Sequence, residues 1–282
     1  MKIHNMFQDT KITESSYSLL WYSAIVMLLL SVIVPYFYAV TVAIRPAEYL
    51  FGKSYVIWIP PEFTLEHLKD GFDLVKASLI NSTLIGTGVA VLSLIITIPA
   101  SYIFGRKEFP GKSIAFFAVI FALMFPYILL IVPISEMWIQ YGLFNTLPGL
   151  WISYQVFVTP FAIWILKDFF ADLPANLEEA AQVYGLTEFM AFVRVILPLS
   201  LPAIVAVGFL SFLTGWNDFL FSNMLTTGTG PRPATVVIYN KVVGTERPFW
   251  NLIISASLLV GLPPLVLYMV ARHYLAEAFS TA

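Results

Sequence analysis

Residues 178–198 read EEAAQVYGLTEFMAFVRVILP, a helix-prone and partly acidic segment set between two long apolar stretches. Two glutamates open the segment, where the positive end of a helix dipole favours anions. Gly185 can adopt the left-handed conformation that ends a helix, and Thr187 can cap a second helix. Pro198 stops the second arm. The pattern therefore predicts a short helical hairpin over residues 172–198.

Each arm of the predicted hairpin carries an apolar stripe, as expected of a helix that buries one face in a partner. The stripes comprise Leu177, Ala180, Ala181 and Tyr184 in the first arm, and Phe189, Phe192, Val193 and Ile196 in the second. A hairpin lying on the membrane surface is the alternative, and it would carry a Lys/Arg-rich polar face. Here the polar residues are Glu178, Glu179, Glu188 and Arg194. This acidic face favours a protein partner.

The composition is that of a membrane protein. Of 282 residues, 59% are hydrophobic and only 11% are charged, which is too little charge for the surface of a soluble domain. The net charge of −2 gives no basic footprint for nucleic acid. The chain contains no cysteine, which excludes disulfides, thiolate metal sites and a cysteine nucleophile.

Six uncharged windows are long enough to cross a bilayer, which requires roughly 20 apolar residues. The windows are Tyr17–Ile44, Ala77–Gly105, Ser113–Ser135, Met137–Leu166, Val195–Asn217 and Pro248–Ala271, and the spans that they predict lie at about 17–44, 77–105, 113–135, 148–168, 198–220 and 248–271. The predicted fold is all-α, with a six-span transmembrane domain at 17–271 and short tails at 1–16 and 272–282. Prolines inside these windows predict kinked helices.

The distribution of cations on short loops suggests an orientation. The connection Arg106–Lys112 holds three cations, whereas the connection from Glu136 to Pro148 holds none. We therefore expect the Arg106–Lys112 connection, the hairpin and both termini to lie in the cytoplasm. The hydrophilic stretches 45–76 and 221–247 would then be loops that face outwards.

Within the hairpin, Glu179-Ala180-Ala181, Gly185 and Val195-x-Leu197-Pro198 resemble the EAA signature of permease subunits in ATP-binding-cassette importers. Weaker matches follow in the family's order: Phe63-Thr-Leu-Glu66, Leu79-Ile-Asn81-Ser, Phe109-Pro-Gly-Lys112, Met124-Phe-Pro126, Tyr141-Gly-Leu-Phe-Asn-Thr146, Phe169-Phe170, Leu173-Pro174 and Trp216-Asn217. Over nearly its whole length the chain resembles the shorter permease subunit of carbohydrate importers, the group that includes the maltose permease pair. It departs from the family at Val195, where isoleucine is usual, and at Tyr184, where aspartate is common.

This resemblance implies a type I importer permease fold with a cytoplasmic coupling helix, in a bacterial or archaeal cytoplasmic membrane. It implies a second permease subunit in a pseudo-symmetric heterodimer, two ATPase subunits that bind ATP and Mg²⁺, and an extracytoplasmic solute-binding protein. The chain itself would contact lipid and a sugar, bind no nucleic acid, cofactor or metal, and catalyse no reaction. The implied ATPase-coupling residues are Glu178, Glu179, Ala180, Ala181 and Gly185.

Candidates for the solute route are aromatic and amide side chains, because sugars present apolar ring faces and hydroxyl groups. Phe212 and Trp216 share a helical face with Asn217 beside it, and Tyr127 and Asn81 are further candidates. The alternative for the aromatic stripe is packing against lipid or a partner subunit. We favour packing, since aromatic residues are common at membrane interfaces.

Other functions remain open on the sequence alone. An importer for glycerol 3-phosphate or a related polyol would use buried Arg or Lys in the spans, and the windows contain none. An ion-coupled secondary transporter would need ionisable residues at the bilayer midplane, and a membrane enzyme would need a nucleophile with its base. Gly111-Lys112-Ser113 resembles part of a phosphate-binding loop, but Arg106 stands where its first glycine is required.

Overall fold

The computed structural model describes residues 2–50, 58–243 and 249–280, and every secondary-structure element in these ranges is a helix. The chain divides into two compact units. One consists of Met1–Phe72 with Phe249–Leu258, and the other of Asp73–Pro248 with Leu259–Ala282. Helices α2 (Glu66–Arg106) and α12 (Trp250–Ser280) each contribute to both units.

In the first unit, the end of α1 (Lys2–Ala43) packs against the beginning of α12. The side-chain amide of Asn251 donates to the carbonyl oxygen of Arg45 at 2.6 Å, beside the short helix η1 (Ala47–Tyr49). Helix α1 begins at Lys2 and not near residue 17, because residues 2–16 contain no glycine or proline that would break it. Residues 2–16 of the expected tail are therefore helical.

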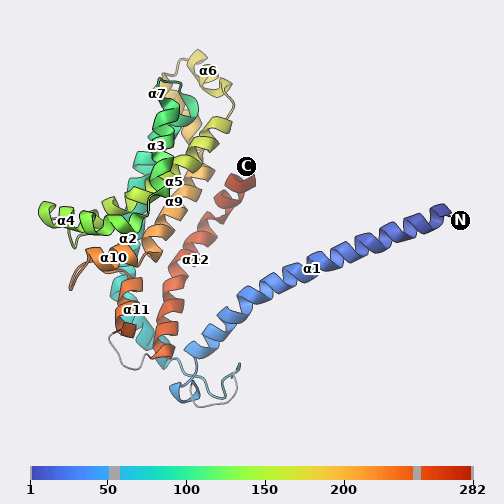
Figure 1. The fold of residues 1–282 in the computed structure, drawn as a ribbon, viewed down its shortest axis with the longest axis vertical. Coiled ribbons are helices and arrows are strands. Elements are labelled where there is room, and N and C mark those ends of the chain that lie inside the picture. Colours follow the sequence, from blue (N-terminus) through green and yellow to red (C-terminus); the bar gives the residue numbers. More distant parts are fainter. Residues whose placement is uncertain (1, 51–57, 244–248, 281–282) are drawn as a thin grey trace. The chain divides into compact units, whose positions relative to one another are not determined.

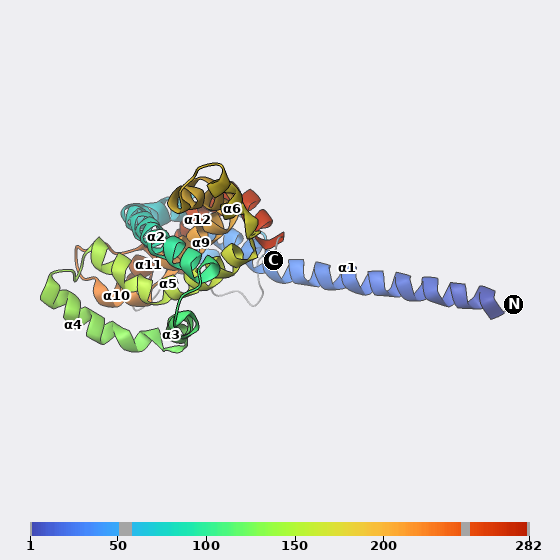
Figure 2. The same ribbon diagram turned by 90° about the horizontal axis from the view of Figure 1, so that it is seen from above.

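The second unit contains the remaining helices (Figure 1). They are α3 (Lys112–Met124), η2 (Tyr127–Leu130), α4 (Ile131–Tyr141), α5 (Leu147–Asp172), α6 (Asn176–Val183), α7 (Glu188–Ala191), η3 (Phe192–Ile196), α8 (Leu197–Leu199), α9 (Leu201–Asn217), α10 (Leu220–Leu225) and α11 (Ala234–Val243). Helices α2, α5 and α9 run side by side, as two perpendicular views show (Figures 1 and 2). The predicted outer loop at 221–247 thus contains two helices, and residues 244–248 lie outside the described part.

Among the described residues, four helices are long and apolar enough to cross a membrane. Two bent pairs of helices pass the same test together, Lys112–Met124 with Tyr127–Tyr141 and Asn176–Val183 with Glu188–Leu199, and the second of these pairs is the predicted hairpin. The predicted window 113–135 is not one straight helix, because its two halves meet at an angle of 88°. Pro126 disfavours the helical conformation of the residue before it, and Phe125 is accordingly extended, with ψ 131°. Helix α9 is shorter than the window 198–220, since Asp218 leaves the helical conformation.

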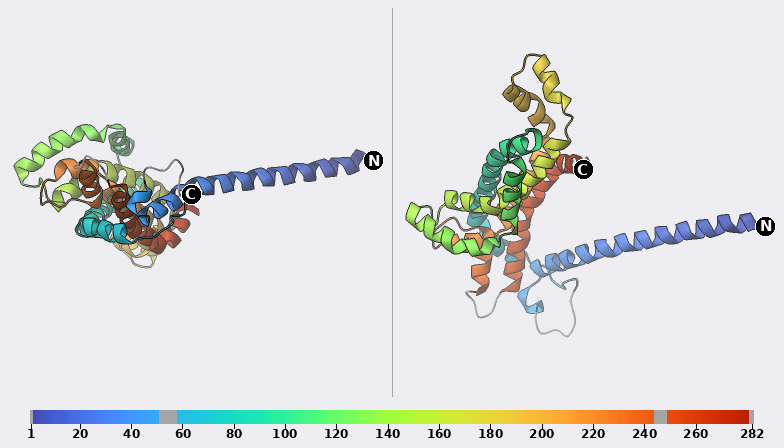
Figure 3. Two further views of the ribbon diagram at one scale, coloured as in Figure 1. Left: turned by 90° about the horizontal axis from the view of Figure 1, so that it is seen from below. Right: turned by 45° about the horizontal axis from the view of Figure 1, so that its top comes forward.

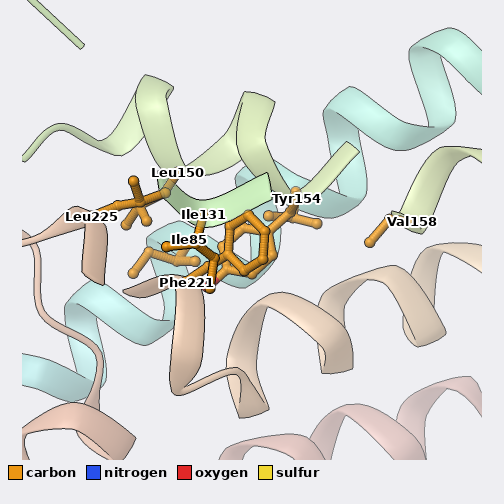
Figure 4. Close-up of a cluster of buried hydrophobic side chains, with 8 residues drawn as sticks. Ile85, Ile131, Leu150, Tyr154, Val158, Phe221 and Leu225 are labelled. Carbon is orange, nitrogen blue, oxygen red and sulfur yellow. The ribbon is translucent and has the colours of Figure 1, made fainter. Parts of the chain in front are cut away.

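One hydrophobic core joins α2, α4, α5 and α10 within the second unit (Figure 4). It contains Ile85, Val89, Ile131, Leu150, Tyr154, Val158, Phe221 and Leu225. Tyr154, the largest of these side chains on α5, is fully buried beside Phe221, with their ring centroids 5.9 Å apart. This core fixes α10 against α5 and thereby places the segment that follows α9.

Glycines allow the long helices to approach closely, as is common in membrane proteins. A Cβ atom added at Gly215 of α9 would lie 3.0 Å from the Cα of Gly86 on α2. At Gly105, near the end of α2, an added Cβ would lie 2.8 Å from the carbonyl oxygen of Lys167 on α5. Because that neighbour is backbone, it cannot move aside as a flexible side chain would.

We expect Gly105→Ala to destabilise the protein by about 1–3 kcal/mol, because the new methyl group overpacks the contact with α5. Thermal unfolding of the purified chain in detergent measures the effect. Gly261→Ala on α12 is the matched control, since an added Cβ there meets nothing within 4 Å. Alanine forms helices better than glycine, so the control should unfold at the same temperature or slightly higher. Equal loss of stability in both variants would contradict this account.

Candidate functional site

The predicted hairpin forms between α5 and α9, and it projects beyond the ends of α2 and α3 (Figure 3). Its first arm, Asn176–Val183, and its second arm, Glu188–Leu199, meet at an angle of 119°. Gly185 lies between them with φ 86°, in the left-handed region that a glycine adopts without strain. Thr187 caps the second arm by accepting a hydrogen bond from the backbone amide of Met190 at 3.2 Å.

The second arm continues into α9 through one turn of π-helix, Phe192–Ile196. Pro198 accounts for this wider turn, because its ring displaces the carbonyl four residues earlier and it has no amide hydrogen to donate. The helix nevertheless resumes at Leu197, and only Ser200 separates it from α9. The hairpin therefore connects directly to the apolar helix α9, with only Ser200 between them.

A buried ion pair anchors the base of the hairpin to the end of α2. The guanidinium of Arg106 donates to Oε2 of Glu178 from Nη2 at 2.8 Å and from Nε at 3.1 Å. The same guanidinium donates to the carbonyl oxygens of Leu173 at 2.6 Å and Pro174 at 3.1 Å. The side chains of Arg106 and Glu178 are only 6% and 13% exposed. Arg106 thus holds both the start of α6 and the chain that leads into it.

Two neighbours complete this anchor. The hydroxyl of Tyr102 donates a hydrogen bond to Glu178, and the ammonium of Lys107 forms an ion pair with Glu188 on the second arm. The Lys107 ammonium also lies 5.2 Å from the centre of the Tyr102 ring. The two arms of the hairpin are therefore bonded to Arg106, the last residue of α2, and to Lys107, which follows it.

The electrostatics of the anchor favour an ionised Glu178. Burial by itself would raise the pKa of Glu178, but the hydrogen bonds from Tyr102 and Arg106 outweigh it and lower the pKa below its ordinary value. Burial would likewise lower the pKa of Lys107, but its bonds to Glu188 and Tyr102 raise the pKa overall. Glu178 and Lys107 are therefore both charged at neutral pH.

The predicted apolar stripes divide between two faces of the hairpin. Ala181, Ile196, Leu177 and Phe192 pack inwards, and the last three join a core with α2, α5 and α9. Ala180 is exposed, and on the same outer side Val183, Tyr184 and Phe189 are 85%, 88% and 74% exposed. The expectation of one continuous stripe per arm was therefore wrong, because α2 and α9 already cover the inner half of each.

The five predicted coupling residues fall into two groups, one exposed on the outer face of the hairpin and one turned inwards. Glu179, Ala180 and Gly185 are exposed on the hairpin, and none of the ion pairs among the described residues involves Glu179. Ala181 is 7% exposed, and Glu178 is engaged by Arg106. The sequence analysis placed Arg106 in a basic connection but did not identify it as the partner of Glu178, because the two residues lie 72 positions apart.

The aromatic stripe on α9 is packed inside the second unit, against other helices of this chain, and not against lipid or a partner subunit as the packing alternative expected. Trp216 and Phe212 are 1% and 8% exposed, and their rings stack with centroids 5.4 Å apart. Phe212 lies against Gly86 of α2, where an added Cβ would be 2.9 Å from the ring. Neither side chain lines an open route in this structure. Asn81 is half-buried and donates to the carbonyl oxygen of Arg232 at 3.1 Å, which ties α2 to the segment before α11.

Tyr127 and Asn217, in contrast, line a groove of about 400 Å³ beside α9. Its other lining residues are Phe157, Phe161, Leu210, Leu213, Thr214 and Asp218. The rings of Tyr127 and Phe157 lie 4.9 Å apart, so two aromatic faces meet at one wall. The sequence analysis did not identify Phe157 and Phe161 as candidates for the solute route. Their four-residue spacing, which places them on one face of a helix, was the available signal.

Asp218 closes the end of this groove and holds α9, α5 and α10 together. Its Oδ2 atom accepts from the hydroxyl of Tyr154 at 2.7 Å and from the backbone amide of Ser222 at 3.2 Å. The hydroxyl of Thr235 on α11 donates to the carbonyl oxygen of Asp218 at 3.0 Å. These bonds satisfy the carboxylate within the protein and give it a structural role at the end of the helix.

Comparison with known proteins places this architecture among transporters. The chain is 31% identical over 227 residues to the trehalose transport system permease protein SugB of Mycobacterium tuberculosis, across 79% of this chain and 82% of that protein. It is 27% identical over 239 residues to the osmoprotective compounds uptake permease protein GgtD of Synechocystis, across 82% and 80%.

The fold is similar to that of a chain from a bacterial ABC transporter involved in the import of the acidic polysaccharide alginate. The TM-score is 0.80 at 18% identity, and the match covers 93% of this chain and 98% of that chain. Residues 97–279, which include the hairpin, its anchor and the groove beside α9, match the binding-protein-dependent transport system inner membrane component family. The chain therefore belongs to the family of inner membrane components of binding-protein-dependent transport systems.

Proposed function

We propose that this chain is a permease subunit of an ATP-driven importer for a sugar or oligosaccharide. The observation that carries the proposal is the hairpin, which presents an exposed apolar outer face while its base is bonded to α2. Such a surface costs free energy in water and gains it in a partner's groove. The carbohydrate class is supported by the names of relatives that transport trehalose and alginate.

The proposed assembly contains a second permease subunit, two ATPase subunits and an extracytoplasmic solute-binding protein. ATP and Mg²⁺ bind to the ATPase subunits, and this chain binds no cofactor. The hairpin and both termini lie in the cytoplasm, in keeping with the basic connection Arg106–Lys112. The family's dependence on a binding protein supports delivery of the solute from the opposite side.

Within this assembly, Glu179, Ala180 and Gly185 form the surface that meets the ATPase. Ala180 allows close approach, and Glu179 offers an ion pair at the rim. Glu178 and Ala181 act differently, because the structure turns them inwards. They are positioning residues that keep the hairpin in register with α2 and α9.

The anchor at Arg106 makes the hairpin a stiff lever. Movement of the ATPase would displace the hairpin, and the bonds from Arg106 and Lys107 would carry that displacement to α2. The direct connection through η3 and α8 would carry it to α9. A rigid-body motion of these helices can then switch access to the solute route.

The groove beside α9 is the part of this chain best suited to contact the solute. Tyr127, Phe157 and Phe161 offer aromatic faces, and Asn217 offers an exposed amide. Sugars stack on aromatic rings and bond to amides through their hydroxyl groups. The groove lining includes Asp218 and neither lysine nor arginine, which favours a neutral sugar over a phosphorylated polyol.

Cross-linking tests the docking surface, and the cysteine-free chain suits it. We expect a cross-linker on Ala180→Cys to join the chain to the ATPase subunit in membranes containing the assembled transporter. Ala181→Cys, at the next position along the chain, is the matched control, because Ala181 is only 7% exposed and faces inwards. Adducts of Ala180→Cys with lipid alone, and none with the ATPase, would refute the proposal.

Arg106→Gln should release the hairpin from α2. We expect amide hydrogen exchange over residues 176–186 to accelerate at least tenfold, because a buried pair that loses one partner costs on the order of 3 kcal/mol. ATP hydrolysis should continue while uptake falls. Arg194→Gln, on the exposed side of the second arm, is the charge-matched control and should leave exchange unchanged.

In acid, the wild-type chain should lose the same hydrogen-exchange protection over residues 176–186 that Arg106→Gln removes at neutral pH, with protection taken as the intrinsic exchange rate at each pH divided by the observed rate. The pKa of Glu178 in the folded state lies below its ordinary value of 4.5. The ionised carboxylate therefore contributes its full stabilisation of the hairpin at every pH above 4.5. This stabilisation is lost as the pH falls through the lower, folded-state value. Protection that is already lost between pH 7 and pH 5 would contradict this assignment of the anchor.

Asn217→Ala should weaken solute uptake and spare folding. Loss of one hydrogen bond to a sugar hydroxyl should raise the half-saturating concentration about three- to tenfold. Uptake of radiolabelled di- and oligosaccharides by vesicles containing the complete transporter measures the effect. Trp216→Ala serves as the contrast, because it should lower the melting temperature through lost packing. An unchanged half-saturating concentration in Asn217→Ala would exclude the groove from the route.

A further inference from the structure

A second hollow lies at the hairpin end of the second unit, between α2, α3 and α5. It has a volume of about 430 Å³ and is lined by Phe104, Gly105, Lys112, Ser113, Phe116, Phe117, Lys167 and Ala171. It sits where α2 and α5 end and α3 begins, which is where apolar spans meet the membrane surface. Neither the coupling surface nor the groove beside α9 includes any of these residues.

The charged groups that line this hollow are both cationic. Lys112 and Lys167 come from different helices, and their side chains are only 22% and 27% exposed. The Lys167 ammonium lies 4.8 Å from the centre of the Phe116 ring. Two partly buried ammonium groups at one cavity attract an anion more strongly than fully solvated ones would.

Each lysine also has a carboxylate neighbour on its solvent side. Lys112 pairs with Glu108 and Lys167 with Asp168, at 2.8 Å and 2.7 Å. These carboxylate side chains are 88% and 56% exposed, so the pairs are weak and exchange readily with another anion. Neither acidic residue lines the hollow.

The remaining lining matches a phosphate group attached to a hydrophobic body. Helix α3 begins at Lys112 without a side-chain cap, and its first turn has no acidic residue, so the positive end of its dipole adds to the field of the two lysines. Ser113 supplies a hydroxyl donor. Beside these polar groups, Phe116 and the 69%-exposed Phe117 form an apolar wall. Polar and apolar surfaces thus meet at one opening.

We propose that this hollow binds the headgroup of an anionic phospholipid, with the phosphate between Lys112 and Lys167. The start of α3 and Ser113 contribute donors, and the acyl chains lie along the exposed apolar face of α3. Basic pockets at the ends of membrane helices suit such headgroups. The bound lipid occupies the contact between α3 and α5, beside the close approach of Gly105 to α5.

Native mass spectrometry of the purified full chain tests this site. We titrate phosphatidylglycerol, phosphatidylcholine of the same acyl chains, and inorganic phosphate. The wild-type chain should bind phosphatidylglycerol roughly tenfold more tightly than phosphatidylcholine, because each lysine near an anionic headgroup contributes substantially to binding. Lys112→Gln with Lys167→Gln should remove that preference. Lys112→Arg with Lys167→Arg should retain it.

Lys69→Gln with Lys76→Gln is the control for general charge loss, since both residues belong to the other end of α2. This pair should retain the preference for phosphatidylglycerol. Ser113→Phe is an independent second test, which stands even if the lysine variant misfolds. It fills the hollow without changing its charge and should lower the binding of phosphatidylglycerol. An undiminished preference in the Lys112/Lys167 glutamine variant or in Ser113→Phe would overturn the proposal. So would displacement of the lipid by an equal concentration of inorganic phosphate, which would indicate a site for soluble anions.

Discussion

The ion pair between Arg106 and Glu178 is the constraint on which the arrangement of the hairpin depends. A guanidinium carries five donors, and here four described bonds reach one carboxylate and two backbone carbonyls. Charged groups this deeply buried are costly unless they are paired, so either residue alone would destabilise the hairpin. The pair therefore holds one face of α6 against α2, and the opposite face stays exposed for a partner.

Close helix contacts complete this arrangement. Gly105 lets α2 approach α5 next to the anchor, and Gly86 with Gly215 lets α2 cross α9. Inside a bilayer, where hydrophobic burial between helices contributes little, such backbone proximity and its dispersion contacts provide much of the association. Displacement of the hairpin would consequently be transmitted by packed helices with few voids to absorb it.

The coupling surface and the groove lie at opposite ends of α9, because the hairpin precedes Leu201 and the groove ends at Asn217 and Asp218. A helix of this length spans about 25 Å. The second hollow, lined by Lys112 and Lys167, lies instead at the hairpin end. Helix α5 contributes to both hollows, with Phe157 and Phe161 in the groove and Lys167 and Ala171 in the second hollow, so the proposed lipid and the solute would contact different parts of the same helix.

The sequence alone determined the membrane class, the positions of most helices and the hairpin, since these follow from local composition, helical spacing and the properties of glycine and proline. It also indicated Tyr127 and Asn217, which line the groove. Tertiary structure decided which apolar face of each hairpin arm stays exposed, that Glu178 turns inwards, and that Phe212 and Trp216 are packed. Helical periodicity marks a face but cannot say which neighbour covers it, because that neighbour is brought there by residues distant along the chain.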